Sequence, residues 1–237
     1  MTYPRSQTPN NQAAAQGRLL ARPAPSIVET TQTGLLPLEL SGGCDALLAV
    51  PASYQPRQPM PFILTLHGAG GTARAGLTLL LPLIEELGVI ALAVGSREQT
   101  WDALLDSYGP DVSCIDQALA YTFRHYSVDP SHLAIGGFSD GASYALSLGL
   151  INGDLFRQIV AFSPGFIVAG KRHGAPSIYV SHGTHDTVLP INRCSRRLVP
   201  QLQRWGYDVH YHEFDGTHTI PLPIAREATT WFLGRKQ

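Results

Sequence analysis

The sequence feature that most constrains the fold is a serine between glycines, in Gly137-Phe138-Ser139-Asp140-Gly141. It closes a short apolar run over residues 133–136 and opens a helix-like stretch over residues 142–151. This pattern predicts a strand, a tight turn and a helix, because glycine tolerates the backbone crowding beside such a turn. The turn would expose the hydroxyl of Ser139 and direct the first helical amides at whatever it attacks. The alternative is a glycine-rich turn in which Ser139 caps the helix.

Composition limits the classes of protein that the chain can be. Its 237 residues are 44% hydrophobic and 15% charged, which suits one domain with a sizeable core. The net charge of −1 does not favour nucleic acid as a partner. No apolar run approaches the roughly 20 residues of a membrane span. We expect residues 1–17 to be a disordered tail and residues 18–237 to be one domain. The tail lacks the pattern of a signal peptide, so a cytoplasmic location is the default expectation.

Apolar runs alternate with helix-like stretches from residue 61 onward. Runs without polar alternation are typical of strands that helices cover on both faces. The alternation therefore predicts a mostly parallel sheet wrapped on both faces, with no insertion large enough for a lid domain. We expect strands over residues 61–66, 89–94, 133–138, 158–162, 177–181 and 208–214, and helices over residues 76–87, 111–126, 142–151, 192–205 and 222–233.

The segment before residue 61 predicts antiparallel edge strands. Residues 34–40 and 45–50 flank a hairpin-like turn, and residues 18–22 form a shorter strand candidate. The three cysteines, Cys44, Cys114 and Cys194, are widely spaced and form no Cys-x-x-Cys motif. We interpret them as structural thiols, with one bridge plus a free thiol as the alternative.

Polar clusters follow several of the expected strands, at the edge where parallel sheets bind ligands. A serine hydroxyl needs a base within hydrogen-bond reach, and the base needs an orienting acid. Ser139, Asp186 and His218 occur in that chain order, each on a loop after a strand. Among nine histidines, His218 is our candidate base because it alone follows the last strand on a Gly-Thr turn. We interpret Asp215 as shaping that turn.

Two further roles are assigned on the same reasoning. The backbone amides of Ala69, with Gly70 as the alternative, and of Asp140 are the candidate donors to an oxyanion. We interpret His67 as holding the first of these loops. His182 and His185 flank Gly183 before Asp186, but without a third clustered ligand they do not make a metal site, and we expect no metal.

The walls of a substrate pocket are harder to predict. Trp101 and Tyr108 lie in the loop over residues 95–109, which we expect to line the site. Phe166 and Ile167 follow a strand end and are candidates for an acyl wall, with ordinary packing as the alternative. We interpret Phe138 as a core residue.

Taken together, these stretches resemble the α/β-hydrolase superfamily. The closest resemblance is to its compact serine esterases: the phospholipase/carboxylesterase and dienelactone-hydrolase-like group, and the esterases allied to polyhydroxyalkanoate depolymerases. The resemblance is carried by residues 66–71, 136–141, 181–190 and 214–221. The chain departs from dienelactone hydrolases proper, which carry cysteine where Ser139 stands, and from lipases with a lid.

The resemblance implies a serine carboxylic-ester hydrolase that forms an acyl-enzyme and needs no cofactor. Its expected partner is a small-molecule ester with a short acyl group, and its oligomeric state is left open. An acyl-thioesterase or lysophospholipase is the alternative within the class. A non-catalytic binding protein on the same fold is the alternative outside it.

Overall fold

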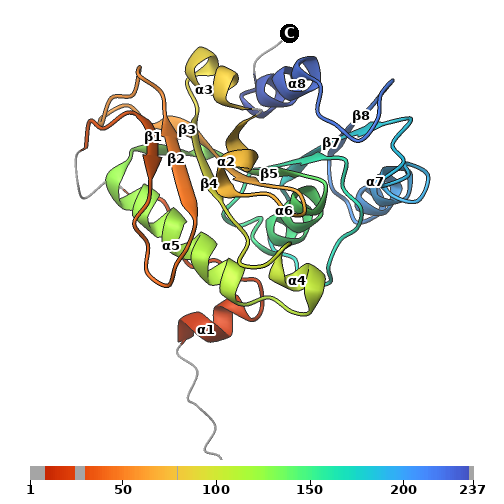
Figure 1. The fold of residues 1–237 in the computed structure, drawn as a ribbon, viewed down its shortest axis with the longest axis horizontal. Coiled ribbons are helices and arrows are strands. Elements are labelled where there is room, and N and C mark those ends of the chain that lie inside the picture. The colour runs from red at the N-terminus through yellow and green to blue at the C-terminus, as the bar shows by residue number, and fades with distance from the viewer. Residues whose placement is uncertain (1–8, 25–29, 79, 235–237) are drawn as a thin grey trace, which may run out of the picture.

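An eight-stranded sheet runs through the molecule, and helices pack on both of its faces (Figure 1). The computed structural model describes residues 9–24, 30–78 and 80–234. The strand order is β1-β2-β4-β3-β5-β6-β7-β8. The strands are β1 (Gly34–Pro37), β2 (Ala46–Val50), β3 (Met60–Leu66), β4 (Ile90–Val94), β5 (Val128–Phe138), β6 (Gln158–Phe162), β7 (Ser177–Gly183) and β8 (Val209–Phe214).

The pairing of the strands confirms the expected fold class. β1 pairs with β2, and β2 with β4, in antiparallel register at one edge. All pairs from β4 through β3 to β8 are parallel. The carboxyl ends of these parallel strands therefore meet along one edge of the sheet, where ligands bind in folds of this kind.

Two hydrophobic cores lie on opposite faces of the sheet because side chains alternate along each strand. On β3, Leu64 and Leu66 enter the core that includes α5 and α6, whereas Ile63 enters the core that includes α2, α3 and α8. The helices are α1 (Pro9–Ala14), α2 (Ala73–Thr78), α3 (Leu81–Leu87), α4 (Asp102–Leu105), α5 (Pro110–His125), α6 (Asp140–Ile151), α7 (Ser195–Arg204) and α8 (Leu222–Phe232).

Two predictions about the N-terminal part were wrong. Residues 18–22 form no strand; instead Arg18 makes an ion pair with Asp154 at 2.8 Å, and the amide of Leu19 donates to Asn152 Oδ1. Part of the expected tail is a helix, α1, whose Ala14 is buried in the core. Residues 1–8 of that expected tail lie outside the described residues.

The helix expected over residues 76–87 is instead two helices, α2 and α3. Pro82 lies in the first turn of α3, where its missing amide costs no helical hydrogen bond. In the interior of one long helix the same ring would clash with the preceding turn. The leucine spacing predicted the helical character but not this break.

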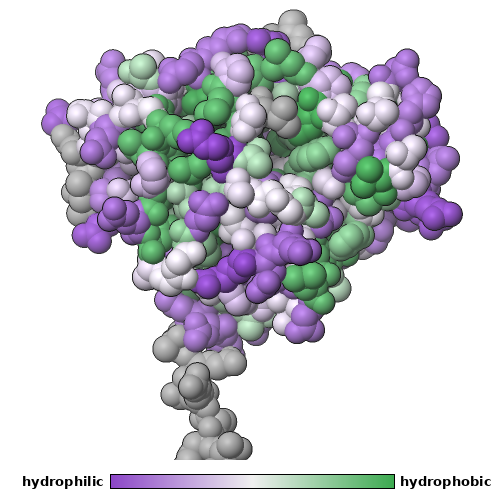
Figure 2. All heavy atoms as spheres, in the orientation of Figure 1, coloured by the Kyte–Doolittle hydropathy of each residue, from purple (hydrophilic) through white to green (hydrophobic). Residues whose placement is uncertain are grey.

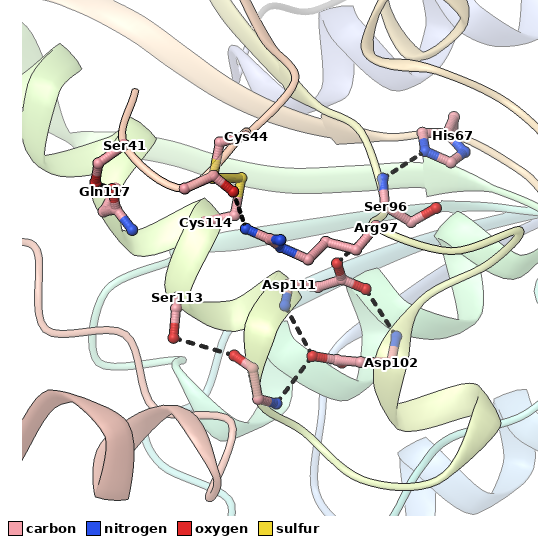
Figure 3. Close-up of a disulfide and its surroundings, with 12 residues drawn as sticks. Ser41, Cys44, His67, Ser96, Arg97, Asp102, Asp111, Ser113, Cys114 and Gln117 are labelled. Carbon is pink, nitrogen blue, oxygen red and sulfur yellow. Dashed lines mark hydrogen bonds between the residues drawn. A yellow bond between two sulfur atoms is a disulfide. The ribbon is translucent and has the colours of Figure 1, made fainter. Parts of the chain in front are cut away.

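A disulfide joins Cys44, in the turn before β2, to Cys114 on α5 (Figure 3). Cys194 remains a free, buried thiol. The interpretation of all the cysteines as thiols was therefore wrong, and the alternative of one bridge plus a free thiol holds. The bridge ties the antiparallel edge of the sheet to a helix that packs on it.

The surface is mixed in character. Hydrophilic and hydrophobic residues are interspersed over the face drawn in Figure 2. In the part of the chain that the structure describes, no helix combines the length and apolarity needed to cross a bilayer.

Candidate active site

Ser139 lies at the apex of a sharp turn between β5 and α6. Its backbone has φ 57° and ψ −121°, a conformation that costs a non-glycine residue energy and that recurs at functional turns. The turn is held by the Ser139 amide, which donates to the carbonyl of Phe162 at 3.0 Å. A Cβ on Gly141 would lie 2.1 Å from the carbonyl oxygen of Leu66, so only glycine fits there. The predicted strand, turn and helix are therefore present.

His218 lies between Ser139 and Asp186 and reaches both. Its Nε2 lies 2.9 Å from Ser139 Oγ, and its Nδ1 lies 2.5 Å from Asp186 Oδ2. With Nδ1 protonated, the imidazole donates to the carboxylate and accepts from the hydroxyl. The three side chains come from the loops after β5, β7 and β8, so the structure brings the predicted set together.

The carboxylate of Asp186 is held as an anion in a nearly buried position. The amides of Val188 and Leu189 donate to Oδ1 at 2.9 Å and 2.8 Å. Burial opposes ionisation, but the hydrogen bonds from His218 and from the Leu189 amide outweigh it and lower the pKa of Asp186. An ionised acid here can orient the imidazole and stabilise its protonated form.

His182 also contacts Asp186, from the buried side. Its Nε2 lies 2.8 Å from the Leu189 carbonyl and 3.1 Å from Asp186 Oδ2, and Ser195 Oγ lies 2.7 Å from its Nδ1. Burial lowers the pKa of His182, against the opposing effects of the Leu189 carbonyl and the Asp186 charge. The ring is therefore uncharged at neutral pH. Because the Leu189 carbonyl can only accept, the proton lies on Nε2, and Ser195 donates to Nδ1.

Two serine–histidine pairs thus lie around Asp186, and they differ in their exposure to solvent. Ser195 and His182 are each 0% exposed, so no substrate reaches that hydroxyl. Ser139 is 9% exposed and lies on a turn at the ligand-binding edge of the sheet. The pair of Ser139 and His218 is therefore the candidate for chemistry.

The amides of Ala69 and Asp140, the candidate oxyanion donors, are free to donate, whereas the amide of Gly70 is not. Among the described residues, neither the amide of Ala69 nor that of Asp140 has a hydrogen-bond partner. The amide of Gly70, in contrast, donates to the carbonyl of Gln99 at 2.6 Å. Gly70 is therefore the poorer candidate, and its hydrogen bond holds the loop that presents Ala69.

The loop after β4 supports both of these donors instead of lining the site. The amide of Ser96 donates to His67 Nε2 at 2.9 Å, and Trp101 Nε1 donates to the His67 carbonyl at 3.0 Å. Thr100 Oγ1 donates to the Asp140 carboxylate at 2.7 Å. His67, which is buried, holds the loop as expected, and burial lowers its pKa.

Two acidic residues anchor the same loop, as Figure 3 shows. Asp111 accepts from the amides of Arg97 and Asp102, at 2.9 Å and 2.8 Å. Asp102 in turn accepts from the amides of Gly109 and Asp111, both at 2.9 Å. Burial, helped by the charge of Asp102, raises the pKa of Asp111 to about 6 against the hydrogen bond from the Arg97 amide.

The expected pocket walls need correction. Trp101 and Tyr108 are buried in the core on the α5 and α6 side, where both rings pack against Tyr144. Ile167 lines a separate hollow beside Trp205, and Phe166 is 43% exposed. The loop does lie at a strand end, but its large aromatic side chains gain more from burial than from facing solvent.

Three residues near the site were missed or misread from the sequence. Phe138, expected in the core, is half-buried and packs its ring 4.7 Å from that of His218. His182 was considered as a base and as a metal ligand but not as a partner of Asp186, although its place before Asp186 was a usable signal. Thr100 carried no signal, because its partner lies 40 residues away in the chain.

Known proteins share this fold and part of this sequence pattern. Residues 111–226 match the model of the phospholipase/carboxylesterase family. The crystal structure of esterase PE8 superposes with a TM-score of 0.64 at 22% identity, covering 86% of this chain and 100% of that one. The Bacillus cereus carboxylesterase has a TM-score of 0.62 at 18% identity, covering 82% and 95%. FphF, a fluorophosphonate-binding serine hydrolase of Staphylococcus aureus, has a TM-score of 0.67 at 13% identity, covering 85% and 99%. No match was found among curated proteins.

The part of the chain that the structure describes has the α/β-hydrolase fold of these structures. The match over residues 111–226 agrees with the resemblance to the phospholipase/carboxylesterase group that the sequence predicted.

Proposed function

We propose that the chain is a serine carboxylic-ester hydrolase in which Ser139 is the nucleophile, His218 the general base and Asp186 the orienting acid. The observation that carries the proposal is the position of His218, whose two ring nitrogens reach the hydroxyl and the carboxylate. Side chains from distant parts of the chain meet there in the order that proton transfer requires.

In the first half of the reaction, His218 Nε2 takes the proton of Ser139 as Oγ bonds to the ester carbonyl carbon. The electron pair of the C=O bond moves onto oxygen, and the amides of Ala69 and Asp140 stabilise the resulting oxyanion. When the tetrahedral intermediate collapses, the bond to the alcohol oxygen breaks and His218 protonates the departing alcohol. Asp186 keeps the imidazole in the required tautomer throughout.

In the second half, water takes the place of the alcohol. His218 removes a proton from the water as its oxygen bonds to the acyl carbon. It then returns that proton to Ser139 Oγ as the bond between Oγ and the acyl carbon breaks. The products are a carboxylic acid and an alcohol, and the enzyme returns to its starting state. Thioesters and lysophospholipids, the alternatives within the class, would pass through the same acyl-enzyme.

The decisive experiment replaces the nucleophile. Ser139→Ala should lower kcat for a nitrophenyl ester by about 10⁶-fold, whereas Ser195→Ala should leave most of the activity. A fluorophosphonate, the reagent class named for FphF, should label the wild-type protein at Ser139. An unlabelled wild-type protein would favour a non-catalytic binding protein. Retained turnover by purified Ser139→Ala protein would refute the assignment.

A further inference from the structure

A cavity of about 250 Å³ lies between the sheet and the helices α2 and α8, beneath the loop that presents Ala69. Ile63, Leu80, Phe162 and Ile220 contribute its large apolar walls. An engineered protein cavity of about 150 Å³ takes up benzene, so this volume is large enough for a ligand group.

Small residues create this volume. Gly136 on β5, Gly76 on α2 and Ala225 on α8 line the cavity where larger side chains would fill it. A Cβ added to Gly76 would make only ordinary contacts, the nearest at 3.5 Å to atoms of Thr65 and His67. Nothing in the packing therefore demands glycine at this helical position, where glycine costs about 1 kcal/mol relative to alanine.

The cavity adjoins the candidate active site. Ala69, a candidate oxyanion donor, and Phe138, the neighbour of Ser139, both line it. Gly68, another lining residue, lies so close to the nucleophile that an added Cβ would be 3.3 Å from Ser139 Cβ. Ile220, which follows His218 by two residues, forms part of the opposite wall. A group covalently attached to Ser139 Oγ thus begins next to residues that line the cavity.

The lining excludes a charged or strongly polar occupant. None of the residues that line the cavity carries a carboxylate, ammonium or guanidinium group. Thr65 donates to the Leu92 carbonyl at 3.4 Å, and His67 is engaged with Gly68 and Ser96. Burying a polar group that finds no partner costs several kcal/mol, whereas each buried methylene gains about 0.8 kcal/mol.

We propose that this cavity binds the acyl group of the substrate, and that the preferred acyl group is an unbranched hydrocarbon chain of about six to eight carbons. The inference rests on the proposed function, because it places the acyl chain by its attachment to Ser139. It moves the preference away from the short acyl groups expected from the sequence, since an acetyl group would leave most of the cavity empty.

The test compares nitrophenyl esters from acetate to palmitate with the full-length protein. The value of kcat/KM should rise about threefold to fourfold per added methylene that becomes fully buried, level off near octanoate and fall for dodecanoate and palmitate. A profile that is flat from acetate to octanoate would overturn the inference while leaving the esterase proposal intact. No hydrolysis of any ester would overturn the proposed function and the inference with it.

Variants test the location of the acyl group. Ala225→Leu should lower the octanoate-to-acetate ratio of kcat/KM at least tenfold, and Gly76→Ala, which suits a helix, about threefold. Leu80→Ala should move the optimum toward longer chains. These opposite shifts exclude a general loss of stability as the cause. Leu119→Ala, which removes the same atoms from the other face of the sheet, is the matched control and should leave the ratio unchanged. Unchanged ratios in all three folded cavity variants would overturn the inference.

Discussion

His182 and His218 reach the same carboxylate oxygen, Asp186 Oδ2, from opposite sides, at 3.1 Å and 2.5 Å. Only His218 also reaches a serine that a substrate can approach. His182 is instead fixed between Ser195 and the Leu189 carbonyl, so its ring cannot turn without losing a buried hydrogen bond. We infer that His182 positions Asp186, and through it the base.

Loss of the buried imidazole of His182 should therefore lower kcat more than it changes KM. We expect His182→Leu to reduce kcat by about 10- to 100-fold, since small displacements of a catalytic group cost this much. His182→Gln, whose amide can still donate to Asp186, should recover part of the loss. His185→Ala is the control, because that exposed histidine pairs with Asp215 instead. Equal kinetics for the Leu and Gln variants would show a packing role only.

Thr100 should influence the oxyanion through Asp140. Thr100→Val keeps the shape of the side chain but removes its hydrogen bond to the Asp140 carboxylate. We expect kcat to fall about tenfold, because the Asp140 amide loses its alignment. Thr100→Ser retains the hydroxyl and should stay close to the wild type in steady-state kinetics. A Val variant as active as the Ser variant would contradict this role.

Stability should fall in mild acid because of the buried histidines. Burial lowers the pKa of His67 and His182 below 6.5, so the unfolded chain takes up their protons first. Their full contribution is present above pH 6.5 and is lost as the pH falls through that value toward the lowered pKa. Denaturant titrations from pH 8 to pH 5 should therefore show a declining free energy of unfolding.

The variant His182→Gln isolates one of these histidines. Its free energy of unfolding should depend less steeply on pH between 6.5 and 5 than that of the wild type. The comparison cancels the opposite contribution of Asp111, whose raised pKa of about 6 favours the folded state at lower pH. His185→Gln, at an exposed position, should retain the wild-type slope. Identical slopes for all three proteins would exclude a buried neutral His182.

The disulfide should contribute substantially to stability. Its cysteines are separated by 70 residues, and closing a loop of this size restricts the unfolded chain by about 4 kcal/mol. The double variant Cys44→Ser, Cys114→Ser should lower the free energy of unfolding by up to that amount, whereas Cys194→Ser should cost less. In the denatured, unreduced protein, thiol titration should find one thiol; three would contradict the bridge.

Much of the architecture was predictable because it depends on local patterns. Continuous apolar runs such as residues 158–162 became buried parallel strands, since a strand covered on both faces needs no polar side. The turn at Ser139 was also predictable, because the glycines on both sides of the serine tolerate the backbone crowding of such a turn. The break between α2 and α3 was not, because leucine spacing alone does not reveal where a proline begins a new helix.

The candidate site also has features that were predictable from local patterns and features that were not. Chain order and strand ends were sufficient to bring Ser139, Asp186 and His218 to one edge of the sheet, because parallel strands all end there. Whether Trp101 faces substrate or Tyr144 depends on packing partners that are distant in sequence. The same is true of the bond between Cys44 and Cys114, the free amide of Ala69 and the cavity beside Ala225. By itself the sequence determined which groups can react. Only the tertiary structure decided what surrounds them, because burial and close contacts depend on the whole chain.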